Sequence, residues 1–200
     1  MTRQQSKDET RERLLEAARK LFLQKGLAGA TIEEITAEAG YTRGAFYSNF
    51  EGKESVLLEL LLHNIKQMTT EAARIASSGT TPMEMRTSLL KYYRTLFYQN
   101  DAFILWAEAR ILAFRNEQFR AAFNELIKDA LSHIVDILNK FATATGIRLE
   151  VPPSYIAFGL AALFEGIQAN KISNPQHISD EMVETVMAYF LSSALLGKPA

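Results

Sequence analysis

The stretch TIEEITAEAGYTRGAFYSNF, residues 31–50, decides the fold that this sequence predicts. Thr31 can cap a first helix, and Glu34 stands at the third helical position, where its side chain can reach back to the N–H of the cap. Gly40 suits the left-handed residue that ends a helix, and Thr42 can cap a second helix at once. Two short helices joined by so tight a turn predict a helix-turn-helix, the unit that places its second helix in a DNA major groove.

The second predicted helix has one apolar face and one polar face. Phe46 and Phe50 are four residues apart, so they point inward together. The opposite face carries a small residue, two hydroxyl groups and a guanidinium, from Gly44, Tyr47, Ser48 and Arg43. A helix of about eight residues is not stable alone in water, so it needs a scaffold that buries the two phenylalanines. An ordinary helical corner with a solvated polar face has the same spacing, so the spacing alone leaves both interpretations open.

The run GYTRGAFYSNFEGKESVL, residues 40–57, is similar to the signature of the TetR family of bacterial transcriptional regulators. That signature has a glycine, a capping Ser or Thr, small residues, an aromatic-Tyr-x-x-Phe pattern and then Lys-Glu before a long apolar helix. This chain matches it at Gly40, Thr42, Gly44, Phe46, Tyr47, Phe50, Lys53 and Glu54. Residues 14–35 resemble the family's first helix and the start of its second. Outside about residues 10–62 the resemblance is only of length, helical content and layout.

The resemblance implies a set of DNA-binding residues on and around the second helix. Arg43 would contact bases, whereas Thr31, Thr42, Tyr47 and Lys53 would mainly hold phosphates, which fixes position without reading sequence. The rest of the set consists of Gly44, a small residue that permits close approach, together with Ala45 and Ser48.

Lys53 stands in the first turn of the next predicted helix, where a cation opposes the helix dipole. We therefore expect folding to gain nothing from this lysine. A phosphate would benefit both from Lys53 and from the free N–H groups at the helix end. The sequence thus favours a phosphate contact, with a solvated lysine as the alternative.

Apolar residues follow helical spacing along the whole chain, and no stretch alternates with the two-residue period of a strand. We predict an all-α fold of about nine helices. The first spans about residues 8–25 and ends at Gly26. Arg3 and Lys7 before this helix, and Arg11 near its start, either follow DNA phosphates or enter the minor groove, or they are simply solvated. After residue 50, further helices are expected at about residues 53–77, 82–98, 100–114, 117–143, 154–171 and 180–195.

The resemblance also divides the chain by function. Residues 1–52 would form a homeodomain-like, three-helix DNA-binding domain with the helix-turn-helix. Residues 53–200 would form a helical effector-binding and dimerisation domain. The net charge is −1, so a DNA-binding surface must come from local placement of charges.

Several classes of protein are disfavoured by what the sequence lacks. There is no cysteine, which rules out disulfides and thiolate metal sites. None of the three histidines has a glutamate three residues before it, and no Gly-rich phosphate loop, HExxH or GxSxG motif occurs. No signal-peptide core or membrane-spanning run of about 18 apolar residues is seen. We expect a cytoplasmic protein that is not an enzyme, with no metal, cofactor or membrane partner.

The last two predicted helices are apolar nearly all round and rich in small residues. Glycine inside a helix costs about 1 kcal/mol relative to alanine, so its presence here suggests closely packed backbones. The two helices either form a four-helix bundle with a symmetry mate or belong to the subunit's own core. TetR-like proteins dimerise through their last two long helices. The resemblance therefore implies a homodimer with an interface drawn from Ala157, Leu160, Ala161, Phe164, Met187, Phe190 and Ala194.

The middle helices are rich in aromatic side chains, which at helical spacing are more often core than ligand contacts. TetR-like proteins generally carry an effector cavity in this part of the chain, and an apolar cavity suits a hydrophobic or aromatic effector. Polar contacts would come from Asn64, Arg110 and Glu165. The predicted lining consists of Asn64, Met68, Tyr93, Phe97, Trp106, Arg110, Phe123 and Glu165.

These inferences together predict a homodimeric transcriptional repressor of the TetR type. It would bind a palindromic operator with half-sites about one helical turn apart. A small effector would release it by moving the helix of about residues 53–77. An activator with the same fold, or a regulator controlled by a partner protein, is the alternative.

Overall fold

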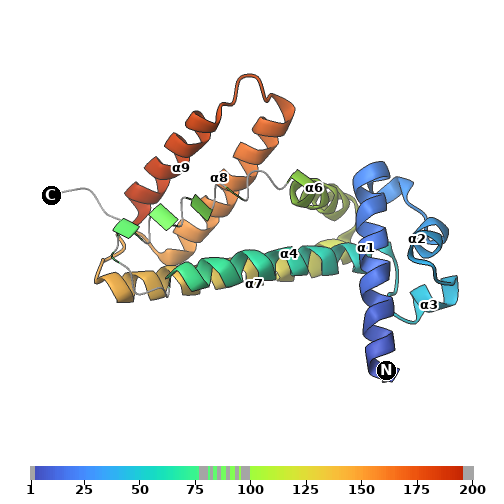
Figure 1. Ribbon diagram of the computed structural model, residues 1–200. Coiled ribbons are helices and arrows are strands. Elements are labelled where there is room, and N and C mark those ends of the chain that lie inside the picture. Colours follow the sequence, from blue (N-terminus) through green and yellow to red (C-terminus); the bar gives the residue numbers. More distant parts are fainter. Residues whose placement is uncertain are drawn as a thin grey trace. The chain divides into compact units, whose positions relative to one another are not determined.

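A computed structural model describes residues 3–76, 81, 83–84, 87–88, 91–92, 95 and 100–195. These residues form helices and loops without any strand, as the sequence predicted (Figure 1). Most of the predicted helix at 82–98, with Tyr93 and Phe97 of the predicted effector set, lies outside the described residues. The helices of the described residues are α1 (Arg3–Gly29), α2 (Ile32–Ala39), α3 (Arg43–Tyr47), α4 (Lys53–Ala76), α6 (Asn100–Arg115), α7 (Glu117–Thr145), α8 (Pro153–Ser173) and α9 (Asp180–Leu195).

The chain divides into two compact units. One comprises Met1–Asn64 with Ile104–Leu126, and the other comprises Ile65–Phe103 with Ile127–Ala200. The unit that contains the helix-turn-helix is thus larger than residues 1–52. The division of the chain by function at residue 52 stays a prediction.

Helices α1, α2 and α3 share one core in the first unit. Phe22 of α1, Ile35 of α2 and Phe46 of α3 are fully buried, and α4 adds Val56 and Leu57. Helix α2 packs against both α1 and α3. Truncating a fully buried phenylalanine to alanine costs about 3–5 kcal/mol. This shared core explains how a five-residue α3 remains folded.

Helix α1 differs from its prediction at both ends. It begins at Arg3, so the residues expected as an arm or tail are already helical from that point. The predicted break at Gly26 is confirmed, since this residue has φ 71° and ψ 166°, and a further turn then runs to Gly29. A Cβ at Gly26 would lie 2.7 Å from Oε1 of Glu108. The break is therefore also the point where the Glu108 side chain of α6 reaches the main chain of α1.

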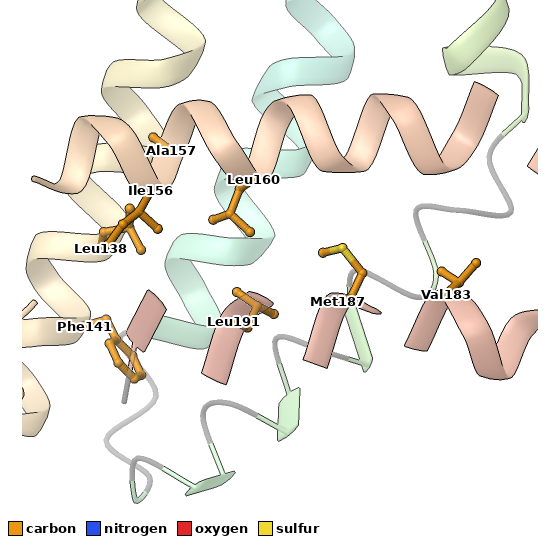
Figure 2. Close-up of a cluster of buried hydrophobic side chains, with 8 residues drawn as sticks. All are labelled: Leu138, Phe141, Ile156, Ala157, Leu160, Val183, Met187 and Leu191. Carbon is orange, nitrogen blue, oxygen red and sulfur yellow. The ribbon is translucent and has the colours of Figure 1, made fainter. Parts of the chain in front are cut away.

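The second unit is built around a core between α7, α8 and α9, and α8 and α9 lie side by side in Figure 1. Figure 2 shows the inward side chains of α8 and α9 meeting one another. At Gly159 a Cβ would lie 2.8 Å from Cζ of Phe190, so this glycine makes room for a side chain of α9 and not for another backbone as expected. The buried members of this core are Leu138, Phe141, Ile156, Ala157, Leu160, Val183, Met187 and Leu191.

That core also contains part of the predicted dimer interface, which itself stays a prediction. Ala157, Leu160 and Met187 are at most 4% exposed, so they are buried within their own subunit. Three more predicted members pack against the same core, namely Phe164, Phe190 and Ala194, and Ala161 is half-buried. Because α8 is apolar nearly all round, its periodicity could not tell the inner face from the outer one.

The outward faces of α8 and α9 are also apolar. On α8, Tyr155 and Phe158 are 70% and 66% exposed. On α9, Met182, Val186 and Tyr189 follow helical spacing, and Tyr189 is 76% exposed. Several large exposed apolar side chains on two neighbouring helices mark an interaction site more often than isolated ones do.

Within the described residues, no helix carries an apolar stretch long enough to cross a membrane. The same part of the chain holds no cluster of three or more metal-binding side chains placed around a common point.

Candidate nucleic-acid interface

Thr31 and Glu34 form the predicted capping box at the start of α2. The Thr31 hydroxyl accepts from the Glu34 N–H at 3.2 Å, and the Glu34 carboxylate accepts from the Thr31 N–H at 3.0 Å. Lys25 also donates to Glu34 at 2.5 Å, and together these bonds lower the pKa of Glu34 to about 2. The Thr31 O–H itself donates to the Glu34 carboxylate at 3.1 Å, so the hydroxyl hydrogen is already used within the capping box. A phosphate contact by Thr31 stays a prediction, and it would have to break that bond.

The turn between α2 and α3 has the predicted geometry. Gly40 adopts the left-handed conformation with φ 74° and ψ 30°, and the next N–H, of Tyr41, donates to the carbonyl of Thr36 at 2.8 Å. Thr42 then caps α3 by accepting from the Ala45 N–H at 3.3 Å. These bonds satisfy free backbone groups at both helix ends and fix the angle of the turn.

The outer face of α3 gathers the predicted contact residues on one exposed surface. Phe46 and Phe50 point inward with ring centroids 5.6 Å apart. The exposed members of the predicted set are Thr42, Arg43, Gly44, Tyr47 and Ser48, and Ala45 is half-buried. Their placement together is what a helix entering a groove requires, while their contacts with DNA stay a prediction.

Arg43 already has partners on its own chain. Its Nη1 lies 2.8 Å from Oε1 of Glu33 on α2, and its Nη2 donates to the Tyr47 hydroxyl at 3.4 Å. The guanidinium carbon lies 5.6 Å from the centroid of the Tyr47 ring. Both side chains of the ion pair are more than 60% exposed, so DNA can displace Glu33 at small cost.

Lys53 contacts the main chain near the C-terminal end of α1. Its Nζ donates to the carbonyl of Leu27 at 2.7 Å and to that of Ala30 at 2.5 Å. Carbonyls at the end of a helix carry partial negative charge and have no partner within the helix. The expectation that folding gains nothing from Lys53 is therefore wrong. A phosphate contact by Lys53 stays a prediction, and it competes with these two bonds.

Arg11 is a residue whose role the sequence did not reveal. It donates through Nε to Oε1 of Glu59 at 2.8 Å and through Nη1 to the carbonyl of Asn49 at 2.6 Å. Its Nη2 pairs with Oε2 of Glu59. Its guanidinium carbon lies 4.3 Å from the centroid of the Phe50 ring. These partners are 38 and 48 residues away along the chain, so no local pattern could have indicated them.

Four of the predicted effector residues come together in the first unit. Nε1 of Trp106 donates to Oδ1 of Asn64 at 3.1 Å, and the Trp106 ring lies 5.9 Å from that of Phe123. Arg110 stands over the same Phe123 ring at 5.9 Å. Phe119, outside the predicted set, stacks on Phe123 at 5.9 Å. The other described members, Met68 and Glu165, belong to the second unit.

A short, exposed helix that follows a capped turn and rests on a three-helix core defines the helix-turn-helix class of DNA-binding proteins. Residues 14–60 match the family model described as "Bacterial regulatory proteins, tetR family". This part of the chain is thus similar to the DNA-binding domain of TetR-family regulators. That family and the curated relatives YerO and KstR2 are described as regulators of transcription, not as enzymes.

These two curated relatives match part of the chain. The HTH-type transcriptional regulator YerO of Bacillus subtilis is 35% identical over 80 residues, which cover 39% of this chain and 28% of YerO. The HTH-type transcriptional repressor KstR2 of Mycolicibacterium smegmatis is 27% identical over 101 residues, which cover 46% of this chain and 49% of KstR2. The matched part of the chain thus spans less than half the length of either relative.

Two solved structures share the fold over nearly the whole chain. A transcriptional regulator from Saccharomonospora viridis, in complex with choline, superposes with a TM-score of 0.73 at 20% identity. The match covers 94% of this chain and 98% of that one. The regulator FadR of Bacillus subtilis, in complex with stearoyl-CoA, gives a TM-score of 0.71 at 18% identity and covers 91% and 96%. At these identities the likeness establishes the fold alone.

Proposed function

We propose that this protein is a sequence-specific transcriptional repressor that inserts α3 into the major groove of its operator. The observation that carries the proposal is the exposed polar face of α3, whose buried side is held by Phe46 and Phe50. Arg43 would leave Glu33 to contact a base, since arginine binds guanine through two hydrogen bonds. Tyr47 and Thr42 would hold phosphates beside it. The protein would act in the cytoplasm, where bacterial DNA lies.

The repressor would work as a homodimer on a palindromic operator. Support comes from the exposed apolar faces of α8 and α9, where Tyr155, Phe158 and Tyr189 are each at least 66% exposed. A second copy of the chain would bury these side chains across a two-fold axis, because an isologous interface pairs the same patch on both subunits. The two copies of α3 would then reach half-sites about one helical turn apart.

A small hydrophobic or aromatic effector would release the protein from DNA. Support comes from the contacts among Asn64, Trp106 and Phe123, which combine aromatic rings with few polar groups. The Asn64–Trp106 hydrogen bond joins α4 to α6. A ligand that bound Asn64 in place of Trp106 would remove this link between the two helices. A coupling of about 1–3 kcal/mol is typical of such switches.

The test is selection of binding sites from genomic fragments by the purified protein at moderate salt. We expect enrichment of a palindrome whose half-sites are centred about 10 base pairs apart. The Tyr47→Ala variant should lose the enrichment while keeping the dimeric mass of the wild type. Failure of the wild type to enrich any fragment would refute the proposal.

The alternative functions differ in the effect that DNA binding has on transcription and in the signal that ends it. Placing the selected site upstream of a reporter gene separates a repressor from an activator, since only deletion of a repressor gene raises expression. A regulator controlled by a partner protein would not be released by any small molecule that occupies the Trp106 region.

A further inference from the structure

The guanidinium of Arg11 joins three separate segments of the first unit. It lies on α1, it pairs with Glu59 of α4 through two nitrogens, and it donates to the Asn49 carbonyl just after α3. It also stacks on the ring of Phe50. Each of its three nitrogens therefore has a partner, and the planar group is held on one face as well.

These contacts are more shielded than the ion pair that the neighbouring arginine of α1 makes. The side chains of Arg11 and Glu59 are 35% and 27% exposed, against 61% and 39% for Arg13 and Glu9. An arginine that binds a carboxylate with two nitrogens has a fixed orientation, which a lysine cannot reproduce. Arg11 is thus held in one place rather than free to reach outward.

Asn49 continues the chain of contacts into α3. Its side-chain Nδ2 donates to the carbonyl of Ala45 at 2.8 Å, in the last turn of the helix. Its own carbonyl accepts from Arg11 at 2.6 Å. Because α3 has only five residues, its direction depends on what holds its two ends. Thr42 holds the first end, and Asn49 with Arg11 holds the second.

We propose that Arg11 is a positioning residue for the recognition helix α3, and that Glu59 of α4 fixes Arg11 in turn. The inference rests on the proposed DNA-binding role of α3. In this proposal Arg11 affects the sequence specificity of DNA binding without contacting DNA itself. It also replaces the interpretation of Arg11 as a phosphate contact, because its donors face inward.

The test compares Arg11→Met, Arg11→Lys and Glu59→Gln with a matched control, Arg13→Met. Arg13 lies two residues further along α1 and carries the same charge in a more exposed pair. Affinity is measured by fluorescence anisotropy on the duplex that the wild type selects and on an unrelated duplex, over a range of salt concentrations. Circular dichroism defines a temperature at which each variant is folded.

We expect Arg11→Met to weaken binding to the selected duplex by about tenfold or more, because DNA binding must then order an α3 that has lost about one hydrogen bond to a charged group. Binding to the unrelated duplex should change no more than it does in Arg13→Met. The lysine variant should not restore affinity. Glu59→Gln, which keeps the guanidinium and one acceptor oxygen, should weaken binding in the same selective way.

Two results would overturn the inference while leaving the proposed function intact. In one, Arg11→Met behaves like Arg13→Met on both duplexes. In the other, it lowers the slope of log affinity against log salt by about 0.9, as loss of a phosphate contact does. If the wild type selects no duplex at all, the proposed function fails and this inference fails with it.

Discussion

Replacing Lys53 with methionine tests whether this side chain serves the fold or the DNA. Methionine keeps an unbranched apolar stem but cannot donate to the carbonyls of Leu27 and Ala30, which lie 2.7 Å and 2.5 Å from Nζ. A hydrogen bond to a charged group contributes about 1.5–3 kcal/mol. Lys53 is half-buried, so water can reach the freed carbonyls, and we expect a total loss of about 2 kcal/mol rather than twice the single value.

Urea denaturation followed by circular dichroism measures this loss as a lower midpoint with an unchanged slope. Lys66→Met is the control, because Lys66 is an exposed lysine on the same helix. A phosphate contact alone would give the opposite pattern. Stability would then stay within about 0.5 kcal/mol of the wild type, as for ordinary surface substitutions. The salt slope of DNA binding would fall by about 0.9. That pattern would refute the structural role of Lys53.

Single contacts elsewhere in the chain give four further predictions. Glu33→Gln should raise affinity for duplex DNA about twofold to fivefold by anisotropy, because Arg43 then has no ion pair to break; a gain that persists in an Arg43→Gln background would contradict this. Glu34 has a folded pKa of about 2, below its unfolded value, so its charge stabilises the fold above about pH 4.5 and this contribution disappears as pH falls towards 2. Urea midpoints of wild type and Glu34→Gln should therefore differ at pH 7 and converge in acid, whereas a constant difference would count against the ionic contribution. Thr42→Ala should lower the free energy of unfolding by about 1 kcal/mol, measured by thermal unfolding. An unchanged midpoint would show that the Thr42 cap does not stabilise the fold. Tyr189→Asp should give a monomer by light scattering, and a persistent dimer would place the interface elsewhere.

The helix-turn-helix could be predicted because its signals are local. The capping box joins residues three apart, and the left-handed Gly40 needs only its own turn. The partners of Lys53 and Arg11 lie between 23 and 48 residues away, so their roles depend on how the helices pack. The sequence therefore described the outer face of α3 well and the contacts that hold it poorly.

The dimerisation helices show a second limit. Hydrophobic spacing located α8 and α9 to within about two residues, since burial and helical period act together. It did not separate Ala157 and Leu160, which face the subunit core, from Tyr155 and Phe158, which face outward. Only the packing of α7 and α9 against α8 decides between the two faces.

The close approach of Glu108 to Gly26 has a mechanical consequence. A Cβ at position 26 would lie 2.7 Å from the Glu108 carboxylate, so that carboxylate lies against the bare main chain of α1. With no side chain at position 26, a shift of α6 can be absorbed at this contact by the Glu108 side chain alone. Leu27 and Ala30, shortly after Gly26 in the chain, supply the carbonyls that bind Lys53. A displacement of α6 that the Glu108 side chain does not absorb would thus reach the first turn of α4 through the main chain of residues 26–30 and the Lys53 side chain.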